Sequence, residues 1–314
     1  MSDNESSASL TMANNVTTIG LCVAGAVVLA STAFVIKIFL FPKKTKKAPV
    51  LLKEKTVKHA VVLVDKEELS SDTRRFRFKL PSGHSLGLPI GYHCYLSARI
   101  GGDLVVRPYT PVSSERDLGF FDLVIKVYKA GVNPRFPEGG KLSQYLDNLV
   151  IGDAIDVRGP GGLLEYEGRC HYAIKPDKQS PPQRFFYRRI GMIAGGTGIT
   201  PMLQLVREMF YDKQDNTHIS MIFANQSPND ILLRGEIDDM ALEQPNRFKR
   251  WYTVDRDAPE DWEFDTGFVS EQMMKDHLPP PGDDVLIVMC GPPPMITACT
   301  KNLENIGYKN IFPY

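Results

Sequence analysis

Two glycine-rich segments, each placed directly after an apolar run, constrain the fold of this chain more than any other feature. The first is Gly191-Met-Ile-Ala-Gly-Gly-Thr-Gly-Ile-Thr-Pro-Met202, and the second, later in the chain, is Cys290-Gly-Pro-Pro-Pro-Met295. When small residues follow a buried strand, a ligand can approach the backbone closely. The first segment also begins a helix whose amides can bind a pyrophosphate. The spacing Gly196-x-Gly198-x-x-Pro201 departs from the full dinucleotide fingerprint. It is the pair, in this order, that favours a nucleotide-binding α/β domain.

Length and composition exclude several classes. The 314 residues exceed what one core usually supports, since single cores stop growing at roughly 250 residues, so we expect two domains. Lys plus Arg equals Asp plus Glu at 37 each, which gives no argument for a nucleic-acid partner. The five cysteines form neither a Cys-x-x-Cys pair nor a His-spaced cluster. We therefore expect no disulfide scaffold, no metal site, and a reducing compartment.

The N-terminal region predicts a membrane anchor over residues 16–41. Ile19 to Ile36 contains eighteen residues without a charge, enough to cross about 30 Å of hydrocarbon as a helix. A cleaved signal peptide would need basic residues before this run, whereas the tail 1–15 carries only acidic charges. The lysines follow the run, so the positive-inside rule predicts that everything after it is cytosolic. Residues 42–56 form a basic linker, whose lysines lie over anionic headgroups or are simply solvated.

The rest of the chain divides by its pattern into two modules. Residues 57–166 contain short alternating strands broken by Gly and Pro, which indicates an antiparallel β-barrel. Residues 167–186 include the polar, proline-bearing passage Lys175 to Pro182 and are interpreted as the interdomain linker. Residues 187–314 alternate apolar strands with helical stretches, which indicates a parallel, Rossmann-like α/β domain.

The second half of the predicted barrel carries the segment Arg107-Pro-Tyr-Thr-Pro111. Two prolines stiffen it, so its side chains lose little entropy when they bind a ligand. Arg107 suits a phosphate, Tyr109 a flat ring, and Thr110 a ring heteroatom. Downstream, Gly139 to Ser143 offers backbone amides and a hydroxyl at an expected helix start, a second anion cradle.

These residues resemble the FAD-binding motifs of the NADH-cytochrome b5 reductases, within the ferredoxin-NADP reductase superfamily, and the resemblance extends from about Val57 to Tyr314. It implies that Arg107 binds FAD phosphate, Tyr109 packs on the isoalloxazine and Thr110 hydrogen-bonds near flavin N5. The further FAD contacts that it implies are Pro108, Val124, Lys126, Tyr128, Gly140, Lys141, Leu142, Ser143 and Thr200.

The resemblance also assigns the glycine segments to NADH. The implied contacts are Gly195, Gly196, Thr197, Gly198, Cys290, Gly291, Pro292 and Met295. Cys290 is expected to position the nicotinamide and not to act as a nucleophile, and a buried structural cysteine is the alternative. Asp255 occupies the place of an acidic residue beside the adenosine ribose, where it would disfavour NADPH. The adjacent Arg256 weakens that inference, and a simple surface aspartate is the alternative.

The mechanism implied by the resemblance is hydride transfer from NADH to FAD, followed by two one-electron transfers to cytochrome b5. A flavin is needed because NADH gives electrons in pairs and a haem iron accepts them singly. Thr110, Lys126 and Cys290 would lie at the reacting rings. The family's partner is acidic, so Lys141 and Lys178 are candidates for a docking face, or are ordinary solvated lysines.

Two rival functions stay open at this point. One is a flavin-dependent NAD(P)H reductase for a quinone or another acceptor, which shares every motif and differs only in its docking face. The other is a non-catalytic membrane-tethered adaptor, which the intact convergent groups disfavour. The leading interpretation is an enzyme of lipid and sterol metabolism in the endoplasmic reticulum or the mitochondrial outer membrane. The family commonly ends in phenylalanine, whereas this chain ends in Tyr314.

Overall fold

The computed structural model describes residues 48–132, 134 and 136–314. The predicted tail 1–15, the predicted anchor 16–41 and the first residues of the predicted linker 42–56 lie outside this range. Within the described residues, none of the helices combines the length and the apolar character that a membrane crossing requires.

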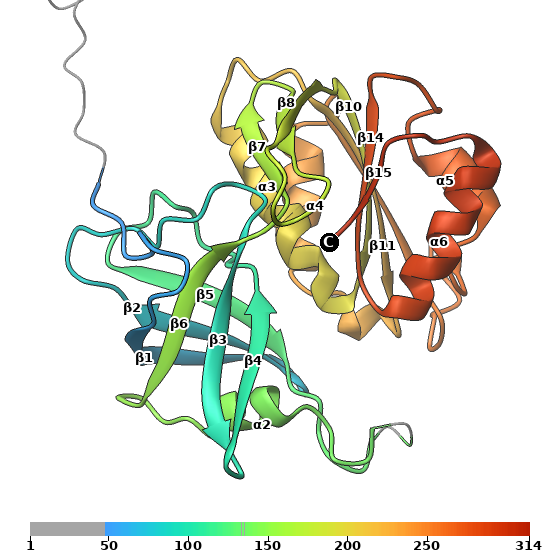
Figure 1. Ribbon diagram of the computed structural model, residues 1–314. Coiled ribbons are helices and arrows are strands. Elements are labelled where there is room, and N and C mark those ends of the chain that lie inside the picture. The colour runs from blue at the N-terminus through green and yellow to red at the C-terminus, as the bar shows by residue number, and fades with distance from the viewer. Residues whose placement is uncertain (1–47, 133, 135) are drawn as a thin grey trace, which may run out of the picture. The chain divides into compact units, whose positions relative to one another are not determined.

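The N-terminal module is an antiparallel six-stranded sheet, as the strand pattern predicts (Figure 1). Its strands lie in the order β4-β3-β6-β1-β2-β5. Their bounds are β1 His59–Ser70, β2 Thr73–Lys79, β3 His93–Ile100, β4 Asp103–Tyr109, β5 Phe120–Lys126 and β6 Ala154–Gly161. Helix α2, Lys141–Asp147, lies between β5 and β6 in the chain.

The two edge strands of this sheet, β4 and β5, are joined just beyond the end of β4. The Val112 N–H donates to the Asp122 carbonyl at 2.9 Å, and the Asp122 N–H donates to Ser113 Oγ at 2.9 Å. These bonds close the sheet into a barrel and bring the Arg107 segment next to β5. Alternate residues of β5 point to opposite faces: Leu123 is buried in the barrel core, whereas Val124 packs outward into a second core.

The predicted interdomain linker 167–186, together with the last residues of the predicted barrel, forms strands of its own. β7 Leu164–Gly168, β8 His171–Ile174 and β9 Gln183–Phe186 form a small antiparallel sheet, and the proline-bearing passage is the loop between β8 and β9. The buried Asp215 carboxylate fastens this sheet to the α/β domain. It accepts hydrogen bonds from the Tyr166 hydroxyl and from the Arg169 N–H.

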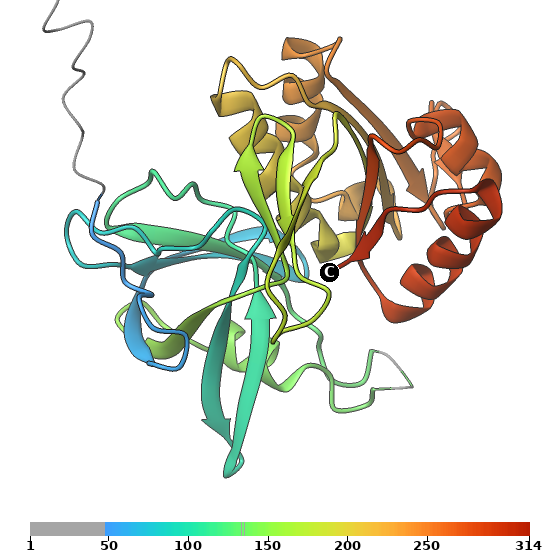
Figure 2. The same cartoon turned by 45° about the horizontal axis from the view of Figure 1, so that its top comes forward.

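The C-terminal module is a fully parallel six-stranded sheet in the order β13-β12-β11-β10-β14-β15. Helices α3 and α4 lie on one face of the sheet, and α5 and α6 lie on the other (Figures 1 and 2). The strands are β10 Arg189–Gly195, β11 His218–Asn225, β12 Phe248–Val254, β13 Asp265–Thr266, β14 Val285–Cys290 and β15 Ile311–Pro313. The helices are η1 Gly196–Gly198, α3 Ile199–Tyr211, η2 Pro228–Asp230, α4 Arg234–Glu243, α5 Glu271–His277 and α6 Pro293–Ile306.

Each central strand of this sheet is buried on both faces, which explains why its sequence is a continuous run of apolar residues. In β10, Met192 belongs to the core under α3 and α4, and Ile193 to the core under α5 and α6. Helix α4 starts later than the apolar pattern from Ile231 predicts, because Leu233 has a left-handed backbone with φ 56°. Helix α6 starts earlier, at Pro293, because the fixed φ of proline suits a first helical position.

Candidate functional site

The two glycine-rich segments meet at the carboxyl ends of the adjacent strands β10 and β14. A Cβ atom on Gly198 would lie 2.0 Å from the Cys290 carbonyl oxygen, and one on Gly291 would lie 3.2 Å from Gly195 Cα. Any side chain at Gly198 would therefore overlap the backbone of β14. A Cβ on Gly195 would lie 2.8 Å from Met295 Sδ. The close approach brings glycine backbone to the carboxyl edge of the sheet, where open α/β sheets bind nucleotides.

Cys290 lies at the end of β14 and is partly exposed. Burial raises the pKa of its thiol to about 11, so the thiol stays protonated at neutral pH. A protonated thiol is a poor nucleophile, which suits contact with a ring better than covalent attack. The Tyr314 N–H donates to the Met289 carbonyl at 2.8 Å, which fixes the C-terminal aromatic residue next to Cys290 along β14.

The start of α3 completes this edge. Thr197 is partly exposed and Thr200 is buried, and Thr200 Oγ1 donates to the Thr197 carbonyl at 3.1 Å. Pro292 is exposed at the start of α6. The predicted NADH segments are thus neighbours in space, except for Asp255.

On the barrel, the end of β4 presents the Arg107 segment. Arg107 and Pro108 are exposed, and Tyr109 and Thr110 are partly buried. Tyr109 packs against the barrel core, and burial raises the pKa of its phenol. Among the described residues, no carboxylate forms an ion pair with the Arg107 guanidinium, which donates to the Val106 carbonyl at 2.7 Å. Arg107 therefore keeps donors available for a phosphate.

The neighbouring edge strand β5 carries Val124, which is buried, and Lys126, which is partly exposed. Tyr128 follows the strand with 54% of its surface exposed. Lys126 Nζ lies 2.8 Å from Asp72 Oδ2. Burial alone would raise the pKa of Asp72, but the hydrogen bond and charge of Lys126, with two hydroxyl donors, hold it below its usual value. The pair fixes the position of the ammonium group and offsets part of its positive charge.

The start of α2 forms a tight backbone cradle beside Tyr128. The Gly140 N–H donates to the Tyr128 carbonyl at 2.8 Å, and Ser143 Oγ accepts from the Tyr128 N–H at 3.1 Å. A Cβ on Gly140 would lie 2.5 Å from Ser143 Oγ, so the cradle requires glycine here. Leu142 is buried beneath it, and Lys141 is exposed, 4.0 Å from the Asp103 carboxylate. The Gly140 amide is used within the turn, whereas the amides that follow it, at the start of α2, suit a phosphate.

The barrel and the α/β domain are in direct contact through β5 and the start of α3. Strand β5 contacts the η1 turn, and Val124 shares one apolar core with Ile199 and Met202 of α3. The Gly91 N–H donates to Gln204 Oε1 at 2.7 Å. This contact brings β5, one of the predicted flavin segments, next to the glycine turn of the predicted nicotinamide site.

A second bond across the domains involves Arg116 of the barrel. Its guanidinium binds both oxygens of Glu208 at 2.6 Å and lies 3.5 Å from the centre of the Tyr211 ring. Glu208 and Tyr211 both belong to α3, the helix that begins at the glycine turn. The helix is thus anchored to the barrel along its length.

Some predicted residues lie apart from this assembly. Asp255 follows β12, which is separated from β10 by β11, and its Oδ1 lies 3.1 Å from Arg256 Nε. Lys178 is exposed in the loop between β8 and β9. The sequence analysis did not single out Phe268, which is 85% exposed just after β13. Nothing in the local sequence signals this exposure.

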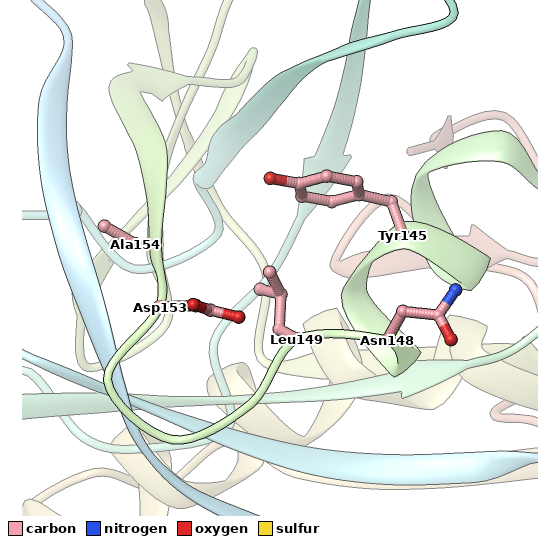
Figure 3. A pocket seen from close by; sticks show the side chains of 5 residues that line it. All are labelled: Tyr145, Asn148, Leu149, Asp153 and Ala154. Carbon is pink, nitrogen blue, oxygen red and sulfur yellow. The ribbon is translucent and has the colours of Figure 1, made fainter.

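A hollow of about 300 Å³ lies elsewhere on the barrel (Figure 3). Its lining comes from the end of α2 and the start of β6, namely Tyr145, Asn148, Leu149, Asp153 and Ala154. None of the predicted site residues lines it, so it does not enter the site described above.

Comparisons with known proteins agree with both modules. A family model described as an oxidoreductase FAD-binding domain matches residues 60–166, and one described as an oxidoreductase NAD-binding domain matches residues 192–301. NADH-cytochrome b5 reductase 2 of Gallus gallus is 57% identical over 262 residues, which are 83% of this chain and 86% of that protein. NADH-cytochrome b5 reductase 3 of Rattus norvegicus is 54% identical over 284 residues, 90% of this chain and 94% of that protein. The crystal structure of the cytochrome b5 reductase domain of Ulva prolifera nitrate reductase matches with a TM-score of 0.78 and 39% identity, covering 85% of this chain and 100% of that chain.

Proposed function

Because the chain belongs to the NADH-cytochrome b5 reductase family, we propose that it is a membrane-anchored reductase that passes electrons from NADH to cytochrome b5. Both domains of an FAD-dependent, NADH-oxidising enzyme are present. The observation that carries the proposal is the contact between β5 and the η1 turn. Residues that suit a flavin and residues that suit a nicotinamide meet there.

The residues of the barrel fit FAD. The exposed Arg107 guanidinium and the backbone cradle at Gly140 both suit phosphate, and a Cβ atom would fill the cradle. We assign the flanks of the isoalloxazine ring to Tyr109 and Thr110. When bound, a flavin supplies the ability to accept a hydride and release electrons singly.

The chain's own task in the reaction is positioning and electrostatics. The turn at Gly195 to Gly198 and the Cys290 end of β14 would hold the nicotinamide over the flavin ring, and the interdomain bonds keep that alignment. Lys126 would offset negative charge that develops on the ring, from a position set by Asp72. The protonated Cys290 thiol would pack against the nicotinamide without forming a bond to it.

We assign docking of the acidic partner to Lys141 and Lys178, both exposed. We also propose that residues 16–41 anchor the chain in a bilayer and that its electrons support lipid and sterol metabolism. Confining both proteins to one membrane would raise their effective concentration.

The experiment places the full chain in lipid vesicles with membrane-bound cytochrome b5, or with a quinone analogue, across a range of salt concentrations. We expect faster turnover with cytochrome b5 that declines as salt rises, because salt screens charge pairing between proteins. Lys141→Gln and Lys178→Gln should reduce this turnover. Lys309→Gln, before β15 and 77% exposed, is the matched control and should not. Faster, salt-independent turnover with the quinone would point to the other acceptor.

A further inference from the structure

Asn225, the last residue of β11, carries a buried amide that nothing in the described protein satisfies. Both its Oδ1 and its Nδ2 are inaccessible to solvent and have no hydrogen-bond partner among the described residues. A buried polar group without a partner costs about 1–3 kcal/mol. Because both atoms lack partners, exchanging the oxygen and nitrogen positions of the amide would not remove the cost.

The position of Asn225 connects this amide to the nucleotide-binding edge. Gly195 pairs with Ala224 in the parallel register of β10 and β11, so Asn225 lies one residue past the end of β10, level with the start of the glycine turn. On its other side Asn225 pairs with Val254, the residue before Asp255. Alternation along β11 puts Asn225 on the same face as Phe223, whose ring lies in the core under α3 and α4.

We propose that Asn225 binds the adenosine ribose and 5′-phosphate of the pyridine nucleotide, and so is a substrate-positioning residue. The proposal rests on the proposed function, which assigns the nicotinamide to Cys290 of β14 and the adenosine ribose to Asp255 after β12. Strand β11 lies between β10 and β12, so its end meets the part of the dinucleotide that joins the pyrophosphate to the adenosine. A ribose hydroxyl both donates and accepts, which matches the two unsatisfied functions of an amide. A phosphate oxygen accepts from Nδ2.

Both amide atoms are inaccessible in the free protein, so the nucleotide reaches them only if binding shifts this side chain or its neighbours. Pairing in the complex would explain why an unsatisfied amide is tolerated in the free protein. A group that is paired only in the complex costs stability in the free protein and adds affinity in the bound one. Removing the amide should therefore raise the stability of the free protein and lower its affinity for the nucleotide. An amide with a purely structural role would lose stability on removal and leave affinity unchanged.

The test compares Asn225→Leu with wild type in the full-length flavoprotein. Leucine has a similar size and no polar atoms, so we expect thermal stability without nucleotide to stay the same or rise. Calorimetric titration should show about ten-fold weaker binding of ADP-ribose, as expected from the loss of two ordinary hydrogen bonds. Binding of nicotinamide mononucleotide, which lacks the adenosine half, should not change. Asn216→Leu, an exposed site before the other end of β11, is the matched control and should bind like wild type.

A second variant covers the case in which Asn225→Leu does not fold. Asn225→Asp keeps the shape, cannot donate when ionised and repels a phosphate, so it should weaken ADP-ribose binding at least as much. Wild-type ADP-ribose affinity in the folded variants overturns the proposal and leaves the proposed function intact, provided that NADH still bleaches the flavin. Wild-type protein that neither binds ADP-ribose nor is reduced by NADH overturns both.

Discussion

Replacing Gly198 by alanine tests whether the contact between the two glycine segments sets the position of the nicotinamide. The added Cβ would lie 2.0 Å from the Cys290 carbonyl oxygen, and ordinary contact begins at 3.4 Å, so the two backbones must separate by 3.4 − 2.0 = 1.4 Å. A change of rotamer cannot relieve this overlap, because the opposing atom is backbone. A misplacement of about 1 Å at a reacting centre can lower a rate by about 100-fold.

We therefore expect Gly198→Ala to bind FAD normally and to be reduced by NADH about 100-fold more slowly, measured by anaerobic stopped-flow absorbance at saturating NADH. Overpacking should also lower the free energy of unfolding by about 1–3 kcal/mol. Gly235→Ala is the matched control, because nothing lies within 4 Å of its added Cβ in α4, and it should be neutral or slightly stabilising. A wild-type rate of flavin reduction in Gly198→Ala would refute the reasoning.

Three further predictions concern charged groups outside this contact. Asp72→Asn should lower the free energy of unfolding at neutral pH. Folding lowers the pKa of Asp72, so the difference in free energy of unfolding between variant and wild type should persist above pH 3.8 and vanish as the pH falls through the lowered folded pKa. A difference that does not change with pH in chemical denaturation would contradict this. Asp215→Ala removes the buried acceptor of the Tyr166 hydroxyl and should lower the free energy of unfolding in urea by about 3 kcal/mol. Flavin reduction by NADH should be unchanged in the folded variant, and a loss under about 1 kcal/mol would count against the prediction. Asp255→Ser removes a negative charge from the predicted ribose site and should raise kcat/KM for NADPH about ten-fold, whereas an unchanged NADH-to-NADPH ratio would leave Asp255 a surface residue.

The sequence predicted the parts of the fold that local patterns encode. Apolar runs ending in small residues located β10 and β14, and Gly139 to Ser143 located the start of α2. The strand β9, Gln183–Phe186, was missed because it follows prolines and owes its conformation to pairing with β8. Its backbone partners are not visible in a local pattern.

Individual site residues show the same division. Tyr109 and Cys290 were singled out because each lies in a distinctive short motif, and their contacts with FAD and NADH stay predictions. The Lys126–Asp72 pair was not predicted, because Asp72 lies in the turn between β1 and β2, Lys126 is the last residue of β5, and neither local pattern indicates the other residue. In the sequence, Asn225 is an ordinary residue at the end of a predicted strand. Only the structure shows that its amide is buried without a hydrogen-bond partner among the described residues.

The most direct test of the electron path is an anaerobic titration of the full-length protein followed by visible absorbance. One equivalent of NADH should bleach the flavin, and ferric cytochrome b5 added afterwards should restore the flavin colour while two equivalents of the cytochrome are reduced, because a hydride carries two electrons. A flavin that NADH does not bleach, or a bleached flavin that leaves cytochrome b5 oxidised, would contradict the account.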